Sequence, residues 1–467
     1  MFSKIATWEG VGLANMKSIV HHFKCKKPRR STRLEIKEQV ETKGKIVQYG
    51  DLGYFEILPP ELKTRIFQCV TIEELSMLAL SSKNMRNRVE QYRCSKAGFK
   101  RFMPIAKLHL PAPLPIEDQA TLLHHFLKLG LLMKRSTCLY ATKERLKLID
   151  AYLSKLYCKH SNCPDISNCM GLLCYGTFLK SVIAGWDDME CGRVFDFITN
   201  STGVSSDIEA MLKTAPGTQA NSSVELNTRL FFRRGILDFI KRRDEKTAWL
   251  SRILKPQPII FQARLLYIIF GPASEGEIEW DEVSESTPRN AQEAQQHFGQ
   301  LASALTMLYH YHSEWSEDDI ISVLDELTNL PDEWVSENVA HLLTLCGDTI
   351  TVRSIASKAI NGRMQEVANI ITSISLVCVK NHYNSSWVVF LVRKTCSLLD
   401  NPKDKLALLN NIAETFKDSI MDLHEYGESE ERDADLEFLV TAQAEFMKEV
   451  LPLAFDDSLS GRKCSIG

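Results

Sequence analysis

The stretch from residue 55 to residue 92 reads FEILPPELKTRIFQCVTIEELSMLALSSKNMRNRVEQY. Its pattern predicts three short helices. Pro59-Pro60 precedes the first helix, because the fixed φ of proline suits the start of a helix. Thr71 can cap the second helix, and Ser81 or Ser82 can cap the third. The stretch therefore reads as a small three-helix unit.

The second of these helices is unusually apolar. Its apolar residues cover nearly the whole circumference: Ile72, Leu75, Met77, Leu78, Ala79 and Leu80. A helix that is apolar all round must be buried on more than one side, and three short helices are too few to bury it alone. Each Leu or Met left in water forgoes about 1.5–3 kcal/mol. Either the rest of the chain or another protein must cover this surplus, and we expect a second protein to do so.

The same residues resemble the F-box family. The matching positions are Leu58-Pro59, Glu61-Leu62, Ile66-Phe67, Glu74-Leu75, Leu78 and Ser82. The resemblance implies an F-box at 54–93 that docks onto the Skp adaptor, which joins it to a cullin ubiquitin ligase. It also implies that six residues lie at or beneath the adaptor interface: Leu58, Pro59, Leu62, Ile66, Leu75 and Leu78. An ordinary helical hairpin at the start of an α-helical domain is the alternative.

Two positions depart from the F-box pattern. Ser81 stands where the family usually has valine, and Met85 stands where it usually has tryptophan. Loss of a buried aromatic side chain would weaken docking, although a flexible methionine can fill part of the gap.

The rest of the chain predicts an all-α protein. Apolar stripes at helical spacing recur over 118–452, which we interpret as a helical region that presents or organises another protein. Its length fits an irregular α-solenoid of stacked helix pairs, with a compact bundle as the alternative. A proline-rich linker is predicted at 103–117, and flexible loops are predicted at 201–223 and 271–293.

The two ends are predicted to be weakly ordered, as a basic tail at 1–50 and a disordered tail at 453–467. The basic run that forms a candidate nuclear import signal is Lys24, Lys26, Lys27, Arg29 and Arg30. The net charge of −3 argues against direct nucleic-acid binding. No stretch reaches the ~18–20 apolar residues of a membrane span. Thirteen cysteines without a short-range pattern suit reduced thiols in the nucleus and/or cytoplasm.

One cysteine-rich segment contains a candidate metal site. Residues 158–174 read CKHSNCPDISNCMGLLC, and the candidate ligands are Cys158, His160, Cys163 and Cys169, with Cys174 at the end of the segment. Thiols and an imidazole can chelate zinc. The spacings are long and irregular, however, and buried cysteine commonly packs as a small hydrophobe. We therefore expect no metal and no cofactor.

The sequence offers no usual entry point to catalysis, because it lacks a RING-type pair of Cys-x-x-Cys motifs, a Walker A motif and a G-x-S-x-G motif. We expect a non-catalytic substrate adaptor of a Skp–cullin–F-box ligase, which recruits an unknown protein target. The alternative is a non-degradative helical scaffold that organises a nuclear protein complex. Further stretches, among them ASKAINGR from Ala356, are similar to one group of the family and imply a role in meiotic germ cells.

Overall fold

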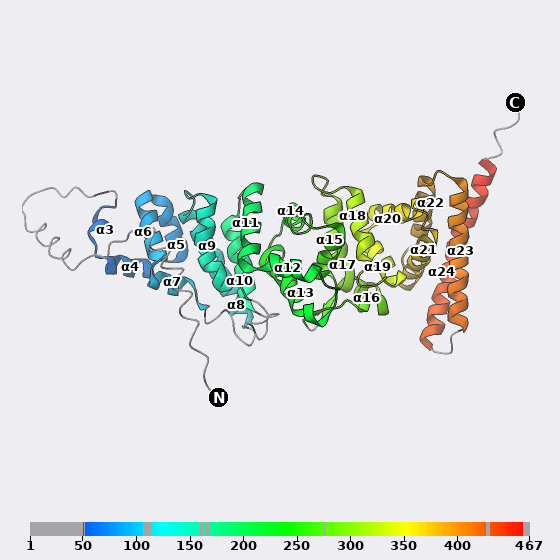
Figure 1. Cartoon of the computed structure of the whole chain (residues 1–467), viewed down its shortest axis with the longest axis horizontal. Helices are drawn as coiled ribbons and strands as arrows, with labels where there is room; N and C mark the ends of the chain where they lie inside the picture. Colours follow the sequence, from blue (N-terminus) through cyan, green and yellow to red (C-terminus); the bar gives the residue numbers. More distant parts are fainter. Residues whose placement is uncertain are drawn as a thin grey trace, which may run out of the picture. The chain divides into compact units, whose positions relative to one another are not determined.

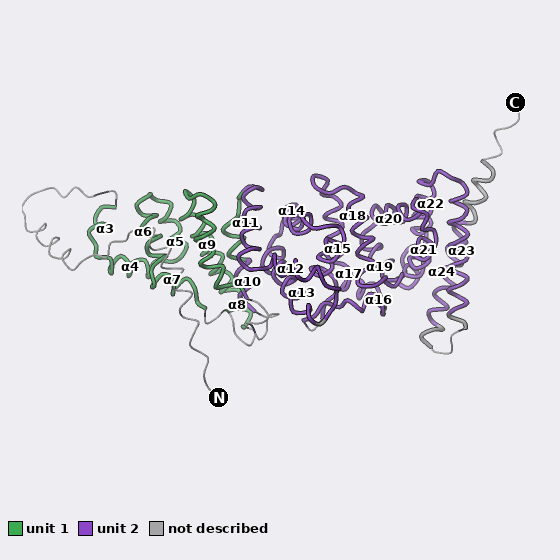
Figure 2. Tube along the Cα trace, in the orientation of Figure 1, with its two compact units in different colours: residues 1–157, 177–186 green, residues 158–176, 187–467 purple. Residues whose placement is uncertain are grey.

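The computed structural model describes residues 50, 52–105, 108, 114–158, 163, 169–274, 276–425 and 430–460. The chain divides into two compact units, which Figure 2 colours separately. The first unit comprises residues up to 157 together with 177–186, and the second comprises 158–176 and the residues from 187 onward. Within the described residues, no helix combines the length and the apolarity that crossing a bilayer would require. The nuclear import candidate Lys24–Arg30 lies outside the described residues.

The first unit is entirely helical in its described part. Its helices are α3 (Tyr54–Ile57), α4 (Pro60–Cys69), α5 (Ile72–Ser81), α6 (Lys83–Arg93), α7 (Lys96–Phe102), α8 (Ile116–Ser136) and α9 (Thr142–Leu156). The predicted three helices correspond to α4, α5 and α6. Thr71 and Glu74 form a full capping box at the start of α5, and Ser82 rather than Ser81 caps α6. Local cap chemistry therefore sets these boundaries.

Helix α5 is buried largely by its own chain. It packs against α6 on one side and against α8 on another. Ile72, Leu75 and Ala79 are buried in these contacts. A polar contact also joins α8 to α5: the Arg135 guanidinium of α8 donates a 2.9 Å hydrogen bond to Ser76 Oγ of α5. The expectation that a second protein covers the whole surplus of α5 is thus wrong for this side of the helix.

The proline-rich segment at 103–117 does not act as a spacer in front of a separate helical region. Its described residues include Met103 and Leu108, which are both buried. Helix α8 begins at Ile116, inside the predicted linker, and returns to pack on α5. The described Pro104 and Pro115 lie outside the helices, since proline disfavours helix in the residue before it. The apolar face of α8 packs on α5 and α6.

In its described residues the second unit is also helical, apart from one short hairpin. Its elements are α10 (Met170–Ile183, of which 177–183 are grouped with the first unit), α11 (Asp188–Thr202), α12 (Val204–Leu212), α13 (Gln219–Phe232), the π-helical turn η3 (Arg233–Leu237), α14 (Arg243–Leu254), α15 (Ile259–Phe270), β1 (Ala273–Ser274), β2 (Glu277–Ile278), α16 (Glu282–Glu285), α17 (Ala291–Tyr309), α18 (Glu317–Leu327), α19 (Ser336–Cys346), α20 (Asp348–Ile360), α21 (Met364–Lys380), α22 (Ser386–Leu398), α23 (Pro402–Glu425) and α24 (Glu430–Ser460). The all-α prediction is confirmed.

Alternate helices stack in two layers over the later part of this unit. Helices α17, α19, α21 and α23 pack in succession as one layer, and α18, α20, α22 and α24 pack in succession as the other. Figure 1 shows α21 beside α23 and α24. This repetition of helix pairs is the arrangement of an α-solenoid, as the spacing of apolar stripes predicted.

A buried ion pair lies near the middle of the unit. Arg264 of α15 and Glu225 of α13 form a 2.9 Å pair whose side chains are 3% and 2% exposed. The Trp280 indole Nε1 donates a 2.8 Å hydrogen bond to the other oxygen of Glu225. Trp280 stacks on Tyr267 at 4.3 Å between ring centroids. These contacts hold the segment after α15 against the helices.

Three predicted boundaries are therefore wrong. The region 201–223 is mostly helix, because Val204, Ile208 and Met211 give α12 a buried apolar stripe. The region 271–293 is not a free loop, since it contains the β1–β2 hairpin and α16 and is anchored by Trp280. The predicted disordered tail begins at residue 453, whereas α24 continues to Ser460.

Candidate functional site

The exposed face of α4 carries apolar side chains that the first unit leaves uncovered. Leu62 and Ile66, one turn apart, are 46% and 41% exposed. An open groove of about 620 Å³ runs along this face and is lined by Leu58, Leu62, Arg65, Ile66, Cys69, Val70 and Glu74. Residues four apart share one face of a helix. Leu62 and Ile66 therefore form a short apolar ridge on α4, and Arg65 and Glu74 contribute one positive and one negative side chain to the lining of the groove.

The opposite face of α4 is fixed to the unit by aromatic and charged contacts. Phe67 is 3% exposed and packs on Tyr92 with ring centroids 5.4 Å apart. The Arg101 guanidinium donates a 2.6 Å hydrogen bond to the Phe67 carbonyl oxygen and a second one to the Val70 carbonyl oxygen. Because the last carbonyls of a helix lack partners within it, Arg101 completes the end of α4. The ridge is thus held on a preorganised helix.

Arg101 was missed by the sequence analysis. It lies on α7, beyond the stretch that carries the family motif. Basic residues near the end of a helix are a general capping signal, but nothing local to Arg101 indicates that its partners are in α4.

The structure separates the six predicted interface residues into two groups. Leu62 and Ile66 are exposed, as is Pro59, while Leu58 and Leu78 are partly exposed. Leu75 is 0% exposed, so it supports the α5–α8 packing and cannot itself contact a partner. Of the two positions that the family resemblance implies, at or beneath the interface, Leu75 is therefore compatible only with the one beneath it.

Two apolar residues of α5 are exposed as well. Met77 and Leu80 are 58% and 46% exposed. The departing positions lie near them: Ser81 is exposed and donates a 2.8 Å hydrogen bond to the Leu78 carbonyl oxygen, while Met85 is partly exposed. The three helices α4, α5 and α6 form despite both departures from the F-box pattern.

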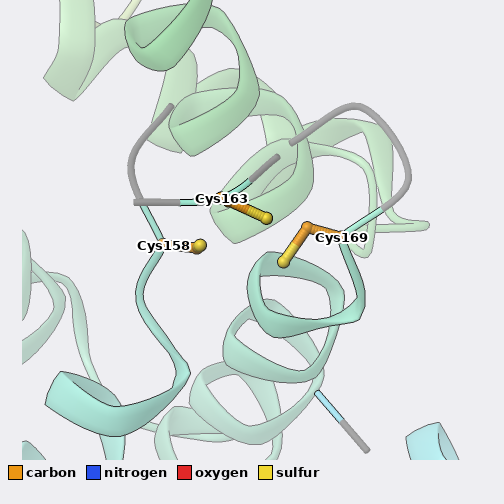
Figure 3. A group of neighbouring side chains, drawn as sticks. All are labelled: Cys158, Cys163 and Cys169. Carbon is orange, nitrogen blue, oxygen red and sulfur yellow. The ribbon is translucent and has the colours of Figure 1, made fainter. Parts of the chain in front are cut away.

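The cysteine-rich segment brings three of its thiols together in the second unit. The Sγ atoms of Cys158, Cys163 and Cys169 lie within 4.8 Å of one another, and Figure 3 shows them pointing into one shared space. Cys174 is buried on α10 but is outside this group among the described residues. His160 lies outside the described residues.

An apolar docking helix on a three-helix unit, followed by stacked helix pairs, characterises an F-box protein with a helical repeat domain. A family model described as "FBXO47, ARM repeats" matches residues 200–458. Human F-box only protein 47 is 39% identical over 419 residues, which cover 87% of this chain and 91% of the human protein. Mouse F-box only protein 47 is 38% identical over 417 residues, which cover 87% and 90%. The chain belongs to the F-box only protein 47 family. No solved structure matches it.

Proposed function

We propose that the chain is the substrate-recognition subunit of a Skp–cullin–F-box ubiquitin ligase, with the exposed face of α4 as its adaptor-binding surface. The observation that carries this proposal is the apolar ridge of Leu62 and Ile66, which is solvent-exposed on a helix that is otherwise firmly anchored. A partner that covers two such side chains gains apolar burial without first having to order them. Membership of an F-box family supports the Skp adaptor as that partner.

In this proposal the chain acts by proximity and makes or breaks no bonds itself. The stacked helices of the second unit bind a protein target and raise the effective concentration of its lysines near a ubiquitin-charged enzyme. We place this activity in the nucleus and/or cytoplasm, and in meiotic germ cells. The target is a protein of unknown identity.

The proposal is tested by purifying the full chain from cells and measuring how much Skp adaptor and cullin it retains. Ile66→Asp introduces a charge into the apolar ridge and is expected to abolish recovery of both proteins, because a buried unpaired carboxylate is costly. Ile360→Asp is the matched control, since Ile360 is a 64% exposed isoleucine on α20. It should retain both proteins.

Two outcomes would contradict the proposal. Equal recovery of the adaptor by Ile66→Asp and by the wild type would exclude α4 as the docking surface. Recovery of the adaptor without cullin, with no rise of a bound partner after proteasome inhibition, would instead favour the non-degradative scaffold.

A further inference from the structure

We propose that Cys158, Cys163 and Cys169 bind one Zn²⁺ ion through their three thiolates. None of these residues belongs to the adaptor-binding face of α4. Their sequence spacing, Cys-x4-Cys-x5-Cys, is not one of the close-paired zinc patterns. It is the fold that brings the three sulfur atoms together.

The geometry suits a thiophilic ion. Sulfur ligands at ~2.3 Å from a tetrahedral zinc lie roughly 3.8 Å apart. The three Sγ atoms already lie within 4.8 Å of one another, and their side chains point into a shared space from three separate points of the chain (Figure 3). Closing the remaining distance requires small rotations of the side chains and no rearrangement of the fold.

The three side chains of the site are buried, and all of its described ligand atoms are sulfur. Cys158, Cys163 and Cys169 are 7%, 3% and 1% exposed. Thiolate sulfur binds zinc and Cu(I) in preference to hard cations such as Mg²⁺ or Ca²⁺. Among the described residues no His, Asp or Glu joins the group. Three thiolates leave one position of a tetrahedral Zn²⁺ ion open, and a water molecule can fill it.

Charge at the site changes when the metal binds. Zinc replaces three thiol protons with three Zn–S bonds and leaves a net charge of −1, and the three protons go to solvent.

One part of that negative charge already has a partner. Cys169 immediately precedes α10, and the Gly171 backbone N–H donates a 3.4 Å hydrogen bond to its sulfur. The positive end of the helix dipole favours a thiolate at this position.

Ordinary core packing does not account for the group equally well. Cys174 shows what a packing cysteine looks like here, since it is 0% exposed on the same helix and lies outside the sulfur group. It therefore provides a matched control for the three clustered thiols.

The test measures metal bound to the full chain, purified without a polyhistidine tag and dialysed against a weak chelator. Elemental mass spectrometry should find about one zinc ion per chain. Cys163→Ser removes one of three ligands and should lower the zinc content by about tenfold. Cys174→Ser should keep the wild-type content.

A second measurement needs no variant and covers the case in which Cys163→Ser fails to fold. Replacement of zinc by Co²⁺ in the wild-type chain should give intense sulfur-to-cobalt charge-transfer absorption. A mercurial thiol reagent should then abolish that absorption and release the metal.

Several results would overturn the proposal. These are a wild-type chain with no bound metal, copper in place of zinc, or equal zinc in wild type and in a folded Cys163→Ser variant. A mass loss that matches a disulfide between two of the three cysteines would also overturn it, as would cobalt binding without sulfur charge transfer.

Discussion

Truncation of the apolar ridge on α4 should weaken adaptor binding while leaving the chain folded. The double variant Leu62→Ala/Ile66→Ala removes the two side chains that are 46% and 41% exposed. Full burial of a Leu or Ile side chain is worth about 1.5–3 kcal/mol, and the exposed fractions leave a little under half of that for a partner to gain from each. The pair therefore accounts for about 1 to 2.5 kcal/mol of binding, or a rise in Kd of roughly 5- to 70-fold.

The assay is calorimetric titration of the full chain with purified Skp adaptor, accompanied by thermal unfolding of each variant alone. Leu406→Ala on α23 is the exposed control, with Leu406 60% exposed, and it should change neither Kd nor Tm. Leu75→Ala is the buried control and should cost about 2–5 kcal/mol of folding stability.

The reasoning about the ridge would be refuted by an unchanged Kd in the double variant. It would equally be refuted by a fall in the double variant's Tm as large as that of Leu75→Ala, because Leu62 and Ile66 would then be core residues rather than surface ones.

Two further predictions concern the second unit. Arg264→Met leaves the buried Glu225 carboxylate without its cation and should cost roughly 3–5 kcal/mol in denaturant unfolding. Arg242→Met should cause no measurable change, since Arg242 pairs with a carboxylate in an ion pair that is exposed on both sides. The hydrogen bond that the protonated Glu282 carboxyl donates to the Glu279 carboxylate is the largest cause that raises the pKa of Glu282 to about 7, and burial is the second. Because this pKa lies above that of an unfolded glutamate, its stabilisation is complete below the unfolded pKa and is lost as pH rises through about 7. As pH rises from acid to neutral, the Tm of the wild type should therefore fall relative to the Tm of Glu282→Gln. Parallel Tm–pH curves for the two proteins would contradict the hydrogen bond between the Glu279 and Glu282 carboxyl groups.

The parts of the fold that depend on local chemistry could be predicted from the sequence. Thr71 and Ser82 cap α5 and α6 through neighbours within three residues, so the three-helix unit follows from a short stretch. Which element buries Leu75 could not be predicted in the same way. Its cover comes from α8, and the periodicity of α5 shows only that something must bury it.

The misplaced loop at 201–223 has a different cause. Its Ser, Thr, Asn and Gly residues favour turns, yet Val204, Ile208 and Met211 recur at helical spacing within it and become buried. Average composition outweighed periodicity in that prediction. The convergence of Cys158 and Cys169 is a third kind of case, since their proximity results from chain closure that no local pattern encodes.

Because α8 packs against α5 and buries part of it, the F-box helices cannot be separated from α8 without exposing apolar residues. Residues 54–93 excised as an autonomous cassette would expose Leu75 and Ala79 to water, and such a fragment would aggregate. Grafting a homologous box onto this chain would fail for the same reason unless the donor sequence also matched the contact surface of α8. The minimal portable module therefore extends at least through Ser136, so expression designs and chimeras should be cut beyond that residue.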